Sequence, residues 1–210
     1  MKRLFAFVSL FLFGAGLAAC EFEETCPPEA AMVRIADASG TAFFIDAYEA
    51  SRVNATDVVM GTGVTMACNV KSVIPWSNVS YQDARNACIE AGKRLCTKEE
   101  WMAACEKTYP YGSGYVAGTC NDGNGLESLA TGSFAGCRTS SGVYDMSGNV
   151  REWVEGGILM GGAYDSSAEG ASCAAALSHV SDYYSYTPSF GDGFRCCRDE
   201  KLSQSGSTEL

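Results

Sequence analysis

The chain has 210 residues, of which 25 are acidic and 15 basic, so its formal net charge at pH 7 is −10. This acidic balance argues against nucleic acid as a partner and against a polybasic membrane-binding patch. The length suits one domain with a sizeable core, and the sequence shows no internal repeat and no Gly/Ser-rich or Pro-rich linker.

The N-terminal segment has the pattern of an export signal. Lys2 and Arg3 give it a positive start, and Leu4–Leu17 is an apolar stretch too short for a comfortable membrane span. Small residues follow at 18–19, as expected of a cleavage site. We therefore predict that residues 1–19 are a signal peptide.

Cys20 directly follows this segment, and Leu-Ala-Ala-Cys resembles a bacterial lipobox, in which the cysteine is lipidated. The alternative is an ordinary signal peptide followed by a chance cysteine. We predict a lipidated tether over 20–31, so that the membrane is a partner through the lipid anchor. The expected location is the bacterial cell envelope, facing the periplasm or the cell surface.

Ten further cysteines predict a disulfide framework, because an even number in an exported chain is typical of one. Counting does not give their connectivity. A metal–thiolate cluster is the alternative, but no CxxC pair occurs and His179 is the only histidine, which argues against the usual zinc sites. The ten are Cys26, Cys68, Cys88, Cys96, Cys105, Cys120, Cys137, Cys173, Cys196 and Cys197.

Regular elements are expected mainly in the first half of the chain. Phe43–Tyr48 is rich in residues that favour strands. Two helices are predicted next, the first capped by Ser80 and ending at Gly92. The second begins at Thr97, with Glu100 as the far member of a capping box.

Beyond Tyr109, Gly and Asn recur every few residues, so this half is expected to consist of loops and short strands. The runs 158–164 and 193–198 each read as one strand. Residues 199–210 form a polar tail.

Four motifs occur in an order that resembles the formylglycine-generating enzyme family, also called sulfatase-modifying factors. They are Lys93-Arg94-Leu95 with Thr97 and Glu100-Trp101, then Asp145 to Val150 with Glu152-Trp153, then Gly161-Gly162, and finally Gly193 to Cys196. The resemblance covers 32–198, which we take as one domain. It implies an α+β fold related to C-type lectins, with long loops that often bind calcium.

The resemblance also implies a calcium loop in the second motif. Asp145 and Glu152 stand where family members supply side-chain oxygens, and Gly148 and Val150 where they supply backbone carbonyls. Calcium takes six to eight oxygen ligands, so such a turn would provide much of the shell. The alternative is a turn held by hydrogen bonds alone.

Catalysis is where the sequence departs from the family. Its oxidases are similar in holding copper(I) between two thiolates five residues apart, after the Gly-Gly motif, and soft copper(I) suits two sulfurs. This interval contains only Cys173, with Ala168 five residues before it and Ser178 five after. A disulfide would remove Cys173 from redox chemistry altogether.

Two hypotheses follow. The first is a binding or structural module at the envelope that lacks the copper pair. The second is an active oxidoreductase that uses copper and O2 to convert a substrate cysteine to formylglycine, with Cys173 as a catalytic thiol. The first is preferred.

The resemblance further implies a bridge between Cys105 and Cys196, joining the second helix to the final strand. Cys197 would then have another partner, with Cys88 and Cys96 as the candidates, because neighbouring residues of a strand point to opposite faces. An unknown protein or glycan ligand is expected at the variable loops 121–139 and 178–192.

Overall fold

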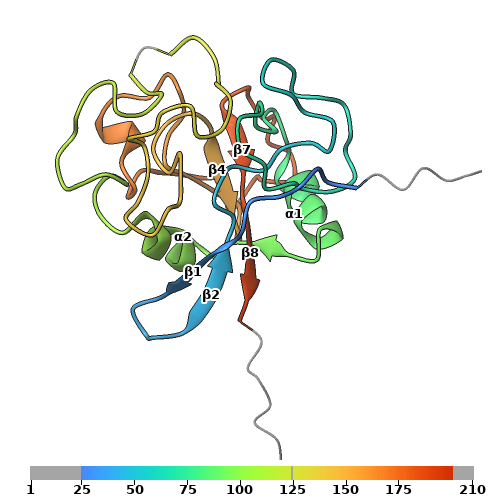
Figure 1. The fold of residues 1–210 in the computed structure, drawn as a ribbon, viewed down its shortest axis with the longest axis horizontal. Helices are drawn as coiled ribbons and strands as arrows, with labels where there is room; N and C mark the ends of the chain where they lie inside the picture. The colour runs from blue at the N-terminus through green and yellow to red at the C-terminus, as the bar shows by residue number, and fades with distance from the viewer. Residues whose placement is uncertain (1–24, 124, 201–210) are drawn as a thin grey trace, which may run out of the picture.

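The computed structural model describes residues 25–123 and 125–200 (Figure 1). The predicted signal peptide, the lipidation of Cys20 and most of the polar tail lie outside these residues. Within them, no helix is both long enough and apolar enough to cross a lipid bilayer.

The elements form two four-stranded sheets, which confirms the expected α+β class. The first sheet is antiparallel, in the order β1 (Val33–Ala36), β2 (Ala42–Ile45), β8 (Cys196–Asp199) and β3 (Arg94–Leu95). The second has the order β6 (Ala176–Ser178), β5 (Ile158–Met160), β4 (Arg151–Val154) and β7 (Asp192–Phe194). Only β4 and β7 run parallel in it.

Both predicted helices are present with the predicted caps. In α1 (Tyr81–Glu90), Ser80 Oγ accepts from the Asp83 N–H. In α2 (Lys98–Cys105), Thr97 and Glu100 form the complete capping box. The remaining helix is a 3-10 turn, η1 (Glu169–Ala171). Residues 106–123 and 125–150 contain neither helix nor strand, in line with the loops that the Gly and Asn punctuation indicated.

Two predicted strands are shorter or divided. The strand expected over 158–164 ends at Met160, because Gly161 and Gly162 adopt positive φ angles of 82° and 71°. The strand expected over 193–198 is two strands, β7 and β8, which meet at Arg195 and belong to different sheets. The sequence pattern could not show this switch between sheets.

The buried residues form two clusters, and the strands contribute alternately to both. Trp153 and Leu159 enter the cluster that contains α1, whereas Val154 and Met160 enter the one that contains Trp101 of α2. This is the alternation that a pleated strand imposes. β4 and β5 are therefore covered on both faces.

Five disulfides connect all ten cysteines of the described residues. The pairs are Cys26–Cys68, Cys88–Cys196, Cys96–Cys197, Cys105–Cys173 and Cys120–Cys137. The expected framework of five bridges is confirmed, and of the two candidate partners for Cys197 the structure selects Cys96.

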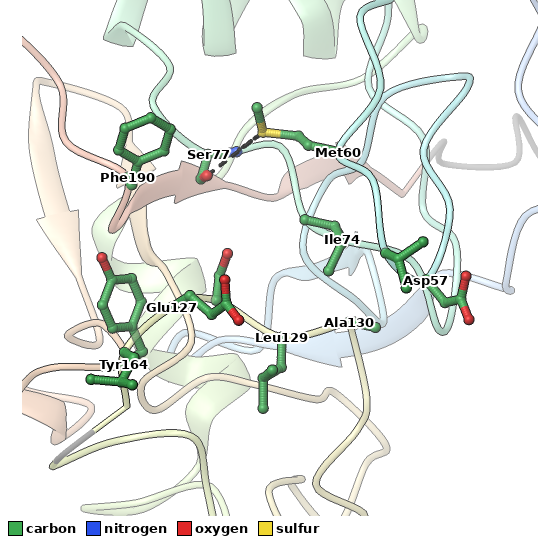
Figure 2. A pocket seen from close by; sticks show the side chains of 12 residues that line it. Asp57, Met60, Ile74, Ser77, Glu127, Leu129, Ala130, Tyr164 and Phe190 are labelled. Atoms are coloured by element: carbon green, nitrogen blue, oxygen red, sulfur yellow. Dashed lines mark hydrogen bonds between the residues drawn. The ribbon is translucent and has the colours of Figure 1, made fainter.

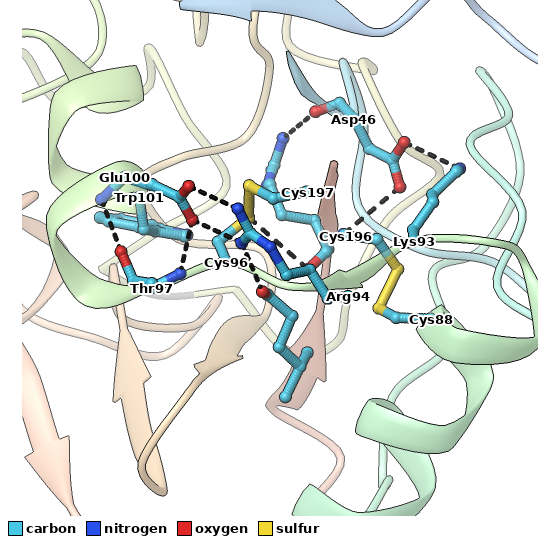
Figure 3. Close-up of a disulfide and its surroundings, with 12 residues drawn as sticks. Asp46, Cys88, Lys93, Arg94, Cys96, Thr97, Glu100, Trp101, Cys196 and Cys197 are labelled. Carbon is cyan, nitrogen blue, oxygen red and sulfur yellow. Dashed lines mark hydrogen bonds and ion pairs between the residues drawn. A yellow bond between two sulfur atoms is a disulfide. The ribbon is translucent and has the colours of Figure 1, made fainter. Parts of the chain in front are cut away.

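The predicted bridge between Cys105 and Cys196 is wrong. Cys196 lies in the cluster with α1 and bonds to Cys88, whereas Cys105 lies in the other cluster and bonds to Cys173. Cys197, on the opposite face of β8, bonds to Cys96, so these two bridges hold the last strand from both sides (Figure 3). The sheet separates Cys105 from Cys196.

Candidate functional site

The segment from Tyr144 to Trp153 forms a tight turn that runs into β4. Asp145 and Asn149 adopt positive φ angles of 58° and 57°, and Gly148 one of 73°. A Cβ on Gly148 would lie 2.2 Å from the Asn121 carbonyl oxygen, so only glycine fits there. The Asn149 N–H donates to the same carbonyl at 2.8 Å. The motif thus anchors the preceding long loop.

At the end of this turn, Glu152 forms a buried ion pair with Arg195. Arg195 Nε donates to Glu152 Oε2 at 2.6 Å, and Nη2 donates to Oε1 at 2.7 Å. Trp101 Nε1 donates to Oε2 as well, at 2.7 Å. Arg195 also donates to the carbonyls of Asp46 and Tyr144. One arginine therefore connects the turn, α2 and both sheets.

Two more buried carboxyls lie near this ion pair. Glu49 accepts from Asn149 Nδ2 at 2.6 Å and from the Val150 N–H at 3.1 Å. Burial raises the pKa of Glu49 well above its usual range, and the negative charges of Asp145 and Glu152 raise it further. Burial likewise raises the pKa of Asp145 to about 6. The hydrogen bond that Asp145 accepts from the Gly132 N–H acts to lower this pKa.

The four predicted calcium ligands, Asp145, Gly148, Val150 and Glu152, do lie in one turn. Both Glu152 oxygens, however, are occupied by the guanidinium of Arg195, whose positive charge opposes a cation at the same place. Within 25–123 and 125–200, no group of three or more His, Cys, Asp or Glu side chains could hold a metal ion. The predicted site has two carboxylates and two backbone carbonyls, so the absence of such a group does not decide it, and calcium binding stays a prediction.

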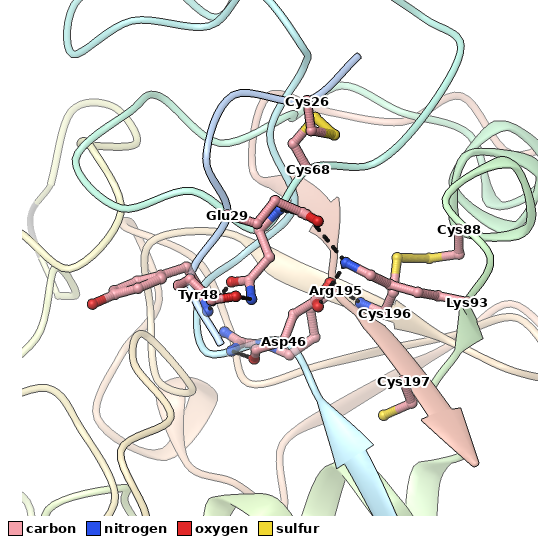
Figure 4. Close-up of polar contacts among 12 residues, drawn as sticks. Cys26, Glu29, Asp46, Tyr48, Cys68, Cys88, Lys93, Arg195, Cys196 and Cys197 are labelled. Carbon is pink, nitrogen blue, oxygen red and sulfur yellow. Dashed lines mark hydrogen bonds and ion pairs between the residues drawn. A yellow bond between two sulfur atoms is a disulfide. The ribbon is translucent and has the colours of Figure 1, made fainter. Parts of the chain in front are cut away.

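A second buried ion pair lies beside the first. Lys93 Nζ donates to Asp46 Oδ1 at 2.9 Å and to Glu29 Oε1 at 3.3 Å (Figure 4). Burial raises the pKa of Asp46 to about 6, while the charge of Lys93 acts to lower it. Since Glu29 follows the Cys26–Cys68 bridge, the first described residues are fastened to the body by both a covalent bond and an ion pair.

Cys173, the predicted catalytic thiol, is 4% exposed and bonded to Cys105. Ala168 and Ser178, five residues to either side, offer no sulfur. His179 Nδ1 lies 3.2 Å from Asp182 Oδ1, and its ring packs at a tilt of 35° against Tyr186, with 3.8 Å between centroids. The described residues thus bring no pair of free thiols together for copper(I).

A cavity of about 650 Å³ lies away from these residues. It opens between the loops 121–139 and 178–192, the two segments expected to bear a ligand site, and the segment 57–77. Its polar side chains include the carboxylates of Asp57 and Glu127. Two of the segments around the cavity were predicted from the sequence, but the residues from 57–77 and Tyr164 were missed, because they carry no spacing signal.

Most of the chain matches a known protein family. The family model described as "Sulfatase-modifying factor enzyme 1-like domain" matches residues 30–200. A curated relative, "Inactive C-alpha-formylglycine-generating enzyme 2" of Bos taurus, is 29% identical over 154 residues, covering 60% of this chain and 50% of the relative. The chain therefore spans about half the length of that relative.

Solved structures share the fold at low sequence identity. Treponema denticola variable protein 1 superposes with a TM-score of 0.58 at 15% identity, covering 80% of this chain and 95% of that one. PvdO from Pseudomonas aeruginosa gives 0.54 at 16% identity, with 82% and 92% covered. CarF gives 0.56 at 18% identity, with 84% and 100% covered. These likenesses confirm the C-type-lectin-like fold of formylglycine-generating enzymes, and the fold alone.

Proposed function

This chain belongs to the sulfatase-modifying factor enzyme 1-like family, and we propose that it is a member that binds a ligand at the cell envelope and carries out no oxidation. The observation that supports this proposal most directly is the state of its thiols. All ten cysteines of the described residues are in disulfides, including Cys173 in the interval where family oxidases hold copper(I). A copper(I) site needs soft thiolate ligands, and paired sulfurs do not supply them.

The name of the bovine relative supports the same proposal, since that protein is called inactive. Loss of the copper pair would leave a rigid scaffold with variable loops, which is a suitable platform for binding. The loops 121–139 and 178–192 are where a ligand would contact the domain. The Cys120–Cys137 bridge closes most of the first of these loops, and such bonds persist outside the cell.

The second part of the proposal is lipid anchorage through Cys20. Five residues lie between Cys20 and Cys26, so the tether reaches roughly 20 Å when extended before it meets the Cys26–Cys68 bridge. The body would therefore stay close to the bilayer. Replacement of Cys20 by Ser should move the protein from the membrane fraction to the soluble fraction; a variant that stays with membranes would place the anchor elsewhere.

The thiol state is tested by titration with a thiol reagent in denaturant, before and after reduction. We expect no reactive thiol among the ten before reduction, and ten after it. In parallel, the protein with copper(I) and oxygen should leave a cysteine peptide unconverted. Two free thiols together with oxygen-dependent conversion of the peptide would establish the oxidase alternative and refute the proposal.

A further inference from the structure

The cavity between the loops has a built, preorganised lining (Figure 2). Its floor is fixed by Ser77, whose N–H and hydroxyl both donate to the Met60 sulfur, at 3.3 and 3.6 Å. Its volume of about 650 Å³ lies within the range of small-molecule sites in proteins.

Buried asparagines hold one wall of this cavity. Asn121 Nδ2 donates to the Glu127 carbonyl at 3.1 Å, and Asn149 Oδ1 accepts from the Leu129 N–H at 2.8 Å. The Gly125 N–H donates to the Tyr164 carbonyl at 2.9 Å. Asn149 is itself a residue of the family turn, so the turn described above positions this wall.

The lining includes apolar side chains that are exposed to solvent. Val58 is 78% exposed, Phe190 65% and Leu126 94%. These three come from separate loops and meet around one cavity. Burial of apolar area contributes roughly 25 cal/mol per Å², so a ligand with an apolar body would gain free energy here.

The charged groups of the cavity are all of one sign. Asp57 and Glu127 line it, and no Lys or Arg does. Among the described residues, neither carboxylate takes part in an ion pair. Figure 2 shows Glu127, Tyr164 and Phe190 among the side chains that line the cavity. A cavity lined by unpaired carboxylates and aromatic rings suits an organic cation, because both the charge and the ring faces attract it.

We propose that this cavity binds a small organic cation, an amine or quaternary ammonium group on an apolar body, with Glu127 as its counter-ion. The apolar body packs against Phe190 and Val58, and the cationic group lies between Glu127 and Tyr164. This assignment rests on the proposed binding function and specifies its ligand class.

Two matched probes test the proposal by isothermal titration calorimetry on the mature chain: 2-phenylethylamine and 3-phenylpropanoate, which share the apolar body and differ in charge. We expect the amine to bind about tenfold or more tightly than the carboxylate, since a charge-assisted contact separates them. Glu127→Gln should weaken amine binding about two- to fivefold, because Glu127 is exposed and solvent screens its charge. Glu127 is exposed, so this substitution leaves the fold intact.

Two further variants separate specific from general effects. Glu90→Gln removes an exposed acid of α1 outside the cavity and should leave amine affinity unchanged. Phe190→Ser should weaken both probes, because it removes apolar contact and not charge.

Equal affinity for the two probes, or equal losses in Glu127→Gln and Glu90→Gln, would overturn the assignment. An acetylated and amidated Leu-Lys-Leu peptide that binds where 2-phenylethylamine does not would also overturn it, in favour of a peptide ligand. Each of these outcomes leaves the thiol titration, and hence the non-oxidase proposal, unaffected.

Discussion

Substitution of Glu152 distinguishes a structural role from a metal-binding role, because the two roles predict different effects of calcium on the free energy of unfolding. In the structure it neutralises Arg195, which is 0% exposed, through two hydrogen bonds of 2.6 and 2.7 Å. Glu152→Gln keeps the size of the side chain and removes its charge. Breaking a buried ion pair by changing one partner costs about 3–5 kcal/mol, because the other charge stays buried.

The lower end of this range is expected, since Asp145 and Glu49 also favour the charged form of Arg195. A loss of about 3 kcal/mol lowers the melting temperature of a domain of this size by about 6–12 °C. Urea unfolding followed by tryptophan fluorescence, with the disulfides intact, measures the free energy, and thermal unfolding measures the temperature. Glu90→Gln, an exposed acid on α1, serves as the control and should change neither.

The same measurements with excess calcium or with chelator decide between the two roles. If Glu152 serves Arg195, wild type and Glu152→Gln keep the same difference in both conditions. If Glu152 is a calcium ligand, chelator destabilises the wild type and leaves the Glu152→Gln variant unchanged. That result would refute the ion-pair reasoning and establish the calcium loop that the family resemblance implies.

Two other predictions concern the disulfides and pH. Removing the Cys105–Cys173 bridge by alanine substitution should lower the free energy of unfolding by about 4 kcal/mol, and removing the Cys120–Cys137 bridge by about 3 kcal/mol, because the bridges span 68 and 17 residues in sequence. Urea unfolding measures both losses. A larger loss for the shorter loop would contradict the chain-entropy argument. Because burial raises the pKa of Asp46 to about 6, above its unfolded value of 3.8, its protonation stabilises the folded state, and that contribution declines as the pH rises through 6. Asp46→Asn should therefore show a flatter dependence of unfolding free energy on pH between 4 and 7; an unchanged dependence would show that Asp46 does not titrate there.

The parts of the fold that could be predicted are those set by local chemistry. Ser80 and Thr97 cap helices through hydrogen bonds that span three residues, and that spacing is visible in the sequence. The five bridges could also be predicted, because an even cysteine count in an exported chain indicates a disulfide framework whatever the fold. The ordered motifs gave the family, which fixed the α+β architecture.

What could not be predicted depends on which face of a sheet a residue occupies. Cys196 and Cys197 are adjacent in sequence but enter different clusters, so their partners are decided by the positions of α1 and of Cys96. The chain leaves one sheet and enters the other at Arg195, where no Gly or Pro marks the change. These features arise from contacts between segments about one hundred residues apart.

The turn from Tyr144 to Trp153 shows how a family motif can be kept while its use in a particular chain is decided by distant residues. Its geometry is local, since Gly148 and two positive φ angles produce it. Its electrostatics depend on distant residues. Glu152 pairs with Arg195, which lies 43 residues later in the sequence, and Asn149 donates to Glu49, which lies 100 residues earlier. Asn149 also fixes Leu129, next to the cavity carboxylate of Glu127. The turn is therefore a structural support for the proposed ligand site and not the site itself.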